Sequence, residues 1–163
     1  MKMKKQLVSI WLILIKENKD KDMGLTITSK IKNCNIELDG GYGMFMVLRQ
    51  AIAKLYDKEF GEHYETLSKC FFKEHFDEFN KKANEILRND RFKDEDEDIV
   101  DFLYMSDCNG KIGYKTCKKL YNLLKYYKSD VPLRYAYYSK NDWEDLKELL
   151  LQCYKHRANL YWY

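Results

Sequence analysis

The sequence has five cysteines, three histidines and a single proline, Pro132, among its 163 residues. The cysteines are odd in number and widely spaced. No two of them form a C-x-x-C pair, and no histidine lies at a zinc-ligand spacing from them. We therefore expect no structural metal and no cofactor, and free thiols in a reducing cytoplasm. The scarcity of proline, with abundant Lys, Asn, Ile and Tyr, is typical of low-GC genes, which many bacteriophages carry.

No apolar run reaches the roughly 20 residues that a membrane-spanning helix needs. The run Leu7–Ile15 is too short, and no small-x-small cleavage site follows it before the charged stretch KENKDKD. Membrane insertion and secretion are therefore not expected. Residues 1–22 are left with three interpretations: an extension upstream of a start at Met23, a β-strand or interaction arm, or a targeting signal. We expect one globular domain over residues 23–163.

The predicted domain also lacks an excess of charge of either sign. Six of the 29 Lys and Arg residues and three of the 26 Asp and Glu residues lie in the first 22 positions, so 23 of each remain. A uniformly basic surface for nucleic acid is not indicated, although a local patch stays open. We expect no strong nucleic-acid partner.

Hydrophobic periodicity predicts the main elements. Alternation over Leu25–Ile31 predicts a strand, and apolar residues at helical spacing predict a helix from Tyr42 to Tyr56. A second helix is expected from an apolar stripe at spacings of three and four, formed by Phe72, Phe76, Phe79, Ala83 and Ile86. A third is expected over Ile99–Met105, with the acidic run Asp94–Asp98 as its solvated first turn. A fourth is expected from Tyr114 to Tyr127.

The C-terminal part completes the predicted fold. Asn141, followed three residues later by Glu144, resembles a capping box and predicts the start of a last helix. The terminal ANLYWY is strand-like and is expected to pair with Leu25–Ile31. The sequence thus predicts an α+β fold: a mostly helical single domain with about four to five helices and a small antiparallel sheet that pairs the N-terminal and C-terminal strands.

The motifs of familiar enzymes are missing. The sequence contains no G-x-S-x-G, H-E-x-x-H, Walker A or paired H-x-T motif. Cys108 beside Asp107 would need a histidine base, and the histidines lie in unrelated segments. We expect a protein that is not an enzyme and keep catalysis as the least favoured alternative.

The stretch SDCNGKIG, Ser106–Gly113, is the most distinctive part of the sequence. Its polar residues and Gly110 resemble the middle of an EF-hand calcium loop. Aligning the two places Met105 and Thr116 at the first and last ligand positions, where carboxylates are required, so calcium binding is not expected. Two interpretations remain: a turn ahead of a helix, or a polar ligand loop. Gly110 and Gly113 allow positive φ and close approach, and the helix start attracts anions.

The order of four segments resembles a family of small phage and bacterial proteins. The segments are MGLTITSKI, DGGYGMFMVLRQAIA, LYMSDCNGKIGYKTCKKLYNLL and a last helix ending in ANLYWY. In that family a Gly-Tyr segment precedes an arginine-bearing helix, and an SDC-x-G-x-IG loop precedes another helix. The resemblance covers most of residues 23–163, favours Met23 as the start and implies no reaction. The matching polar positions are Tyr42, Arg49, Ser106, Asp107 and Gly110.

Two functions are expected on these grounds. The first is a phage-type anti-defence protein in the host cytoplasm that sequesters a small nucleotide-like immune signal. Its predicted ligand-binding residues are Tyr42, Arg49, Ser106, Asp107, Asn109, Gly110 and Lys115. The alternative role for Arg49 is an ion pair with Asp107 that ties the two motifs together.

The second function is a protein-binding inhibitor of a host defence effector such as a nuclease. The aromatic segment Tyr135–Trp143 would form its interface, or else ordinary core. Homo-oligomerisation is left open.

Overall fold

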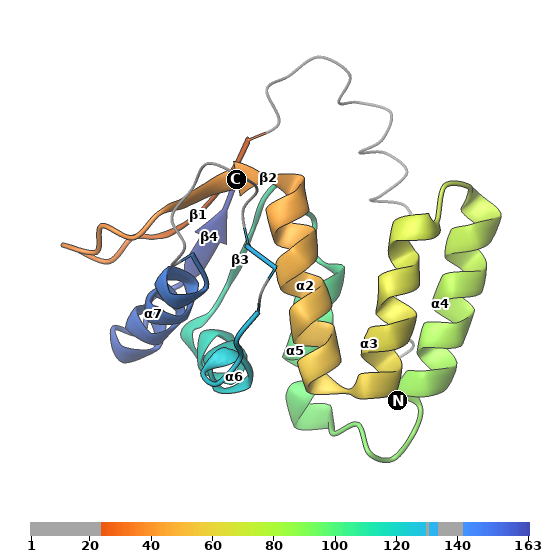
Figure 1. Ribbon diagram of the computed structural model, residues 1–163. Helices are drawn as coiled ribbons and strands as arrows, with labels where there is room; N and C mark the ends of the chain where they lie inside the picture. Colours follow the sequence, from red (N-terminus) through yellow and green to blue (C-terminus); the bar gives the residue numbers. More distant parts are fainter. Residues whose placement is uncertain (1–23, 130, 134–141) are drawn as a thin grey trace.

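The computed structural model describes residues 24–129, 131–133 and 142–163. These residues form six α-helices and a four-stranded antiparallel sheet, as Figure 1 shows. The α+β class is therefore confirmed, with one helix more than expected. The strands are β1 Gly24–Ser29, β2 Leu38–Gly41, β3 Gly110–Ile112 and β4 Leu160–Trp162. The helices are α2 Tyr42–Tyr56, α3 Lys58–Glu65, α4 Lys73–Leu87, α5 Glu97–Tyr104, α6 Tyr114–Leu124 and α7 Asp142–Lys155, with 3-10 turns at Thr66–Lys69 and Asp94–Asp96. None of the described helices is long and apolar enough to cross a bilayer.

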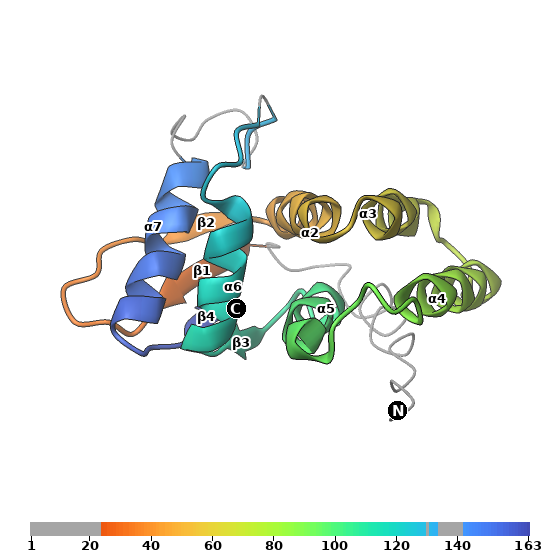
Figure 2. The same ribbon diagram turned by 90° about the horizontal axis from the view of Figure 1, so that it is seen from below.

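The sheet has the strand order β2-β1-β4-β3. The expected pairing of the two terminal strands is confirmed: Ile27 lies opposite Trp162 in an antiparallel register. Leu25, Ile27, Leu160 and Trp162 are buried and lie on one face of the sheet, because alternate residues of a strand share a face. In Figure 2, α6 and α7 lie side by side in front of the sheet, whereas α2 to α5 form the other half of the molecule.

The strand β3 lies within SDCNGKIG, for which the sequence predicts a turn or a ligand loop. Residues Gly110–Ile112 pair with β4, so part of SDCNGKIG is sheet. Gly110 lies opposite Trp162, and a Cβ built on it would be 2.2 Å from the indole Cζ2. Gly110 therefore uses the close approach that glycine allows, here against the Trp162 indole. No described glycine has a positive φ.

Helix α3 was not predicted. Its sequence KEFGEHYE is mostly polar, and only Phe60, Gly61 and Tyr64 are buried. Asp57 caps it by accepting a hydrogen bond from the Phe60 backbone N–H at 2.8 Å. A Cβ on Gly61 would lie 2.4 Å from the Cα of Lys54, so this glycine lets α3 approach α2 closely. Helix α3 is therefore stabilised by its close packing against α2, which the spacing of its apolar residues does not reveal.

Two positions of the predicted apolar stripes are exposed. Leu55, near the end of α2, is 38% exposed, and Phe72, the residue before α4, is 65% exposed. Helix α6 ends at Leu124 rather than Tyr127, and α4 begins at Lys73. The acidic run does lie at the start of α5 as expected. The predicted cap Asn141 and residues 1–22 lie outside the described part of the chain.

Candidate functional site

Arg49 lies at the centre of the predicted loop site and is almost completely buried, with 2% of its side chain exposed. It projects from α2, and its Nη1 donates a hydrogen bond to the Asp107 carboxylate. Its Nη2 donates to the Met105 carbonyl at 2.6 Å. The guanidinium also stacks over the Phe45 ring, with 4.3 Å from Cζ to the centroid. Arg49 therefore ties α2 to the chain that leaves α5.

Asp107 is only 13% exposed and faces Arg49. Burial raises the pKa of the Asp107 carboxyl above its ordinary value, and the Arg49 guanidinium offsets part of that rise. The space beside the pair is about 10 Å³, which holds at most one water molecule. This geometry favours the structural interpretation of the pair. The ligand contact predicted for these residues stays a prediction.

The other residues of the SDCNGKIG stretch are organised by Trp162. The indole Nε1 donates a hydrogen bond to the Ser106 carbonyl at 2.8 Å. The Trp162 ring also packs on Phe45 and Phe102, with centroid distances of 5.1 and 5.8 Å. The C-terminal strand thereby joins the loop, α2 and α5 in one aromatic cluster.

The remaining predicted site residues are more dispersed. Asn109 and Lys115 are exposed, and Gly110 packs under Trp162. The hydroxyl of Ser106 accepts a hydrogen bond from the Cys108 backbone N–H at 3.2 Å. Tyr42 is the first residue of α2, and its side chain lies outside the described part of the structure. The structure thus brings together Arg49, Ser106, Asp107 and Gly110 from the predicted set.

A larger hollow, which we name the α2–α6 cleft, has a volume of about 490 Å³. It lies between the end of α2, the connection from α4 to α5, and α6, which occupy the lower part of Figure 1. Its residues come from segments far apart in the sequence, so no spacing pattern could reveal it. Its lining includes Tyr56, Asp57, Arg91, Phe92, Lys93, Asp96, Ile99, Lys119, Asn122 and Leu123.

One wall of the cleft is aromatic and partly acidic. The rings of Tyr56 and Phe92 lie 5.7 Å apart. Burial, and then the charges of Asp96, Asp57 and Asp98, raise the pKa of Tyr56 to about 12. The phenol is therefore protonated at neutral pH. Within the described residues its hydroxyl makes no hydrogen bond, so it can donate one to a ligand.

The wall of the cleft is fixed by two ion-pair groups. Arg91 Nε donates to Asp57 at 2.8 Å, and Arg91 Nη2 donates to Glu59 at 2.6 Å. These bonds raise the pKa of Arg91 further above its ordinary value. On the other side, Lys119 Nζ donates to Asp98 at 2.8 Å and to the Glu95 carbonyl. Both groups hold the α4–α5 connection in place.

Known proteins give no assignment for either region. The sequence matches no family model, and it has no significant similarity to a curated protein or to a solved structure. The structure is an α+β fold with a buried ion pair between Arg49 and Asp107 and, apart from it, the α2–α6 cleft. Function is argued below from the chemistry of these side chains.

Proposed function

We propose that the protein binds a small nucleotide-like molecule and sequesters it, and that the α2–α6 cleft holds the ligand. The observation that carries the proposal is the size of the cleft together with its lining. A volume of about 490 Å³ lies in the range of small-molecule sites. The space beside Arg49 and Asp107, about 10 Å³, is too small for such a ligand. We therefore propose the α2–α6 cleft, and not the SDCNGKIG loop, as the ligand-binding site.

The aromatic wall supports recognition of a base. Phe92 and Tyr56 present ring surface to the cleft, and a planar heterocycle stacks favourably on such rings. The neutral Tyr56 hydroxyl, the Asp96 carboxylate and the Asn122 amide add hydrogen-bond donors and acceptors to the lining of the cleft. A base with exposed N–H groups fits this combination, because a carboxylate only accepts hydrogen bonds.

The rim of the cleft supports recognition of a phosphate. Lys93 is exposed and lies 3.9 Å from Glu95, a loose contact that a stronger anion can displace. Arg91 stays engaged with Asp57 and Glu59, so it acts as a fixed wall rather than as a phosphate clamp. Lysine binds phosphate as a point charge, which suits an open rim. Lys93 is therefore the expected phosphate contact.

The cellular role that we infer is that of a phage-type accessory protein that counters host defence in the cytoplasm. The low-GC composition and the resemblance to small phage and bacterial proteins support this role. Binding without turnover is enough for it, since capturing a signal molecule lowers its free concentration. The ligand should therefore be recovered unchanged, which distinguishes sequestration from catalysis.

The proposal is tested by isothermal titration calorimetry with nucleoside monophosphates and with cyclic mono- and dinucleotides. At least one should bind, and Lys93→Glu should weaken binding by roughly tenfold or more, because an attraction becomes a repulsion. Tyr56→Phe keeps the ring and removes the hydroxyl, so it should cost about one hydrogen bond, roughly fivefold in affinity. Chromatography of the ligand after long incubation should show no product.

Lys82→Glu is the matched control, because Lys82 is an exposed lysine on α4 outside the cleft lining. It makes the same change in net charge and should leave affinity unchanged. Equal losses in Lys93→Glu and Lys82→Glu would mean that only overall charge matters and would contradict the cleft as the binding place.

A second candidate function is protein binding, and one specific observation favours it. Phe71 and Phe72, adjacent before α4, are 71% and 65% exposed. Exposed aromatic side chains are enriched at the centres of protein interfaces. Of the aromatic segment Tyr135–Trp143, only residues 142 and 143 are described. Trp143 is buried there, and its indole donates to the Val131 carbonyl at 3.0 Å. Loss of host-protein capture in a Phe71→Ser, Phe72→Ser variant that still binds nucleotide normally would support this second function.

A further inference from the structure

Positive charge is concentrated in one stretch of a domain that is neutral as a whole. Residues 109–129 contain six lysines and no aspartate or glutamate. The stretch covers β3, α6 and the turn that follows. Helix α4, in contrast, carries both signs, with Lys73, Glu74, Asp77 and Lys81 among its residues. The charge of α6 is therefore a local feature that overall composition conceals.

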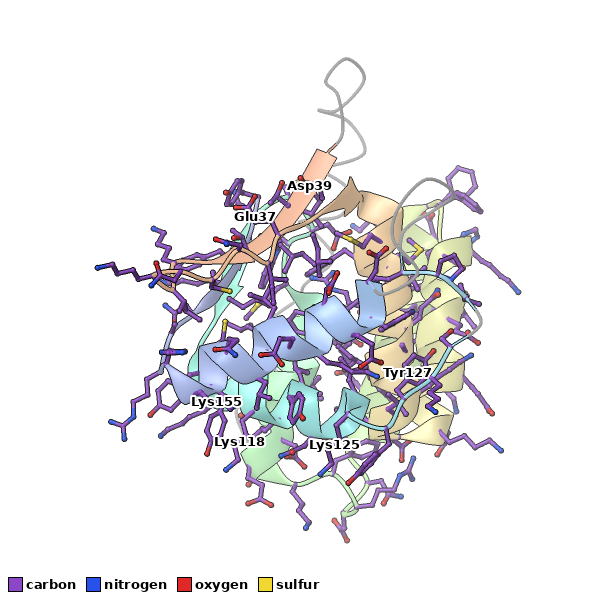
Figure 3. The ribbon with its side chains drawn as sticks, turned by 60° about the vertical axis from the view of Figure 1, so that its left-hand side comes forward. Glu37, Asp39, Lys118, Lys125, Tyr127 and Lys155 are labelled. Atoms are coloured by element: carbon purple, nitrogen blue, oxygen red, sulfur yellow. The ribbon has the colours of Figure 1, made fainter. Side chains whose placement is uncertain are left out.

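Three of these lysines form what we call the lysine face of α6: Lys115, Lys118 and Lys125. They are separated by three and seven residues, which places them on the same side of a helix. All three are exposed. Figure 3 shows Lys118 and Lys125 with Lys155, at the end of α7, on the lower side of the molecule, and the acidic Glu37 and Asp39 on the opposite side. The lysine face therefore lies on the side of the molecule away from Glu37 and Asp39.

The lysine face is not neutralised by the described part of the chain. Lys119, on the adjacent side of α6, pairs with Asp98, whereas no described carboxylate forms an ion pair with the three lysines of the face. Lys118 lies over the Tyr154 ring and Lys125 over the Tyr126 ring, at 4.7 and 5.0 Å from the centroids. Their charges remain free to attract an anion.

An exposed aromatic ring accompanies the charge. Tyr126 is 84% exposed, so it contributes almost nothing to the core. A lysine-rich groove or face with a solvent-facing ring is the pattern that binds single-stranded nucleic acid, because phosphates contact the cations and a base stacks on the ring. A membrane surface fits less well, since interfacial helices present a broad apolar face opposite their lysines, and that face of α6 is buried here.

We propose that the lysine face of α6, together with Tyr126, binds single-stranded nucleic acid. None of the four residues lines the α2–α6 cleft, and the inference does not rest on the proposed nucleotide binding. Contacts go to the phosphate backbone and to one stacked base, so little sequence preference is expected. Affinity should be modest, with a dissociation constant on the order of micromolar at low salt.

The test is fluorescence anisotropy with a fluorescein-labelled deoxythymidine 20-mer, at about 50 and 200 mM NaCl. Wild-type protein should bind, more weakly at the higher salt. The triple variant Lys115→Glu, Lys118→Glu, Lys125→Glu should lose at least tenfold in affinity. For this variant, the slope of the logarithm of the association constant against the logarithm of salt concentration should be shallower by about two, because each of three lost phosphate contacts contributes about 0.7. Tyr126→Ala should lose about tenfold with little change in the salt dependence.

The matched control is the triple variant Lys73→Glu, Lys81→Glu, Lys82→Glu on α4, which carries the same net charge. It should bind the oligonucleotide as wild type does, and circular dichroism melts should show that both triples are folded. Absence of binding by wild-type protein, or equal losses in the two triples, would overturn the proposal. Binding to phosphatidylserine vesicles but not to the oligonucleotide would overturn it in favour of a lipid surface.

Discussion

Replacing Arg49 with alanine perturbs the contact that holds α2 against the chain leaving α5. The change leaves the Asp107 carboxylate, 13% exposed, without its guanidinium and removes the donor to the Met105 carbonyl. Breaking one partner of a buried ion pair typically costs about 3–5 kcal/mol. For a chain of this size, each kcal/mol lowers the melting temperature by about 2–4 °C. We therefore expect a drop of roughly 6–20 °C.

The assay is a double-mutant cycle from urea unfolding of wild type, Arg49→Ala, Asp107→Ala and the double variant. The double variant should lose clearly less than the sum of the two single losses, because removing both charges leaves neither one unpaired. Lys54→Ala is the matched control. Lys54 lies on the same helix and pairs with Glu65 at the surface, so its loss should be at most about 1 kcal/mol.

Two outcomes would refute this reasoning. A loss below about 1 kcal/mol for Arg49→Ala would show that the pair is not a structural tie. Strict additivity in the cycle would show that Arg49 and Asp107 do not act together. Either result would return Arg49 to the ligand-binding role that the sequence suggested.

Three further predictions concern packing and pH. Gly110→Ala places a methyl group against the Trp162 indole and should cost about 1–3 kcal/mol of unfolding free energy in chemical denaturation, whereas Gly24→Ala, which meets no atom within 4 Å, should change it by less than about 0.5. Gly61→Ala should also destabilise, despite the better helix propensity of alanine, because the methyl meets the α2 backbone; a more stable variant would show that the helices can separate at little cost. Hydrogen bonding to Arg91 lowers the pKa of Asp57 below its ordinary 3.8, so this carboxylate stabilises the fold above that pH and the stabilisation is lost as the pH falls through the lower folded value. Stability measured down to about pH 3 should fall less steeply in Asp57→Asn than in wild type, and parallel curves would contradict the assignment.

The fold could be predicted from sequence wherever one element buries a regular face. The apolar spacing of α2 predicted its bounds, Tyr42–Tyr56. The alternation in β1 and the aromatic, strand-like composition of β4 predicted two strands that pair. Helix α3 was missed because its packing depends on Gly61 rather than on an apolar stripe. The short strand β3 was missed because its residues pair with β4, 48 or more positions away, and carry no alternation of their own.

The two functional regions differ in how visible they are in the sequence. Arg49 stands inside the apolar stripe of α2, which signals a buried charge, and its partner Asp107 was identified from the distinctive loop. The α2–α6 cleft has no such signal, because it forms only when α2, the α4–α5 connection and α6 meet. Spacing within one segment cannot reveal a site assembled from three.

The most direct test of ligand capture is native mass spectrometry of the protein purified from cells in which host defence is active. The account predicts a retained small molecule with the mass of a nucleotide on the wild type and on Lys82→Glu, and its absence from Lys93→Glu. A retained host protein in place of the small molecule, or a small molecule that survives Lys93→Glu and Tyr56→Phe unchanged, would contradict it.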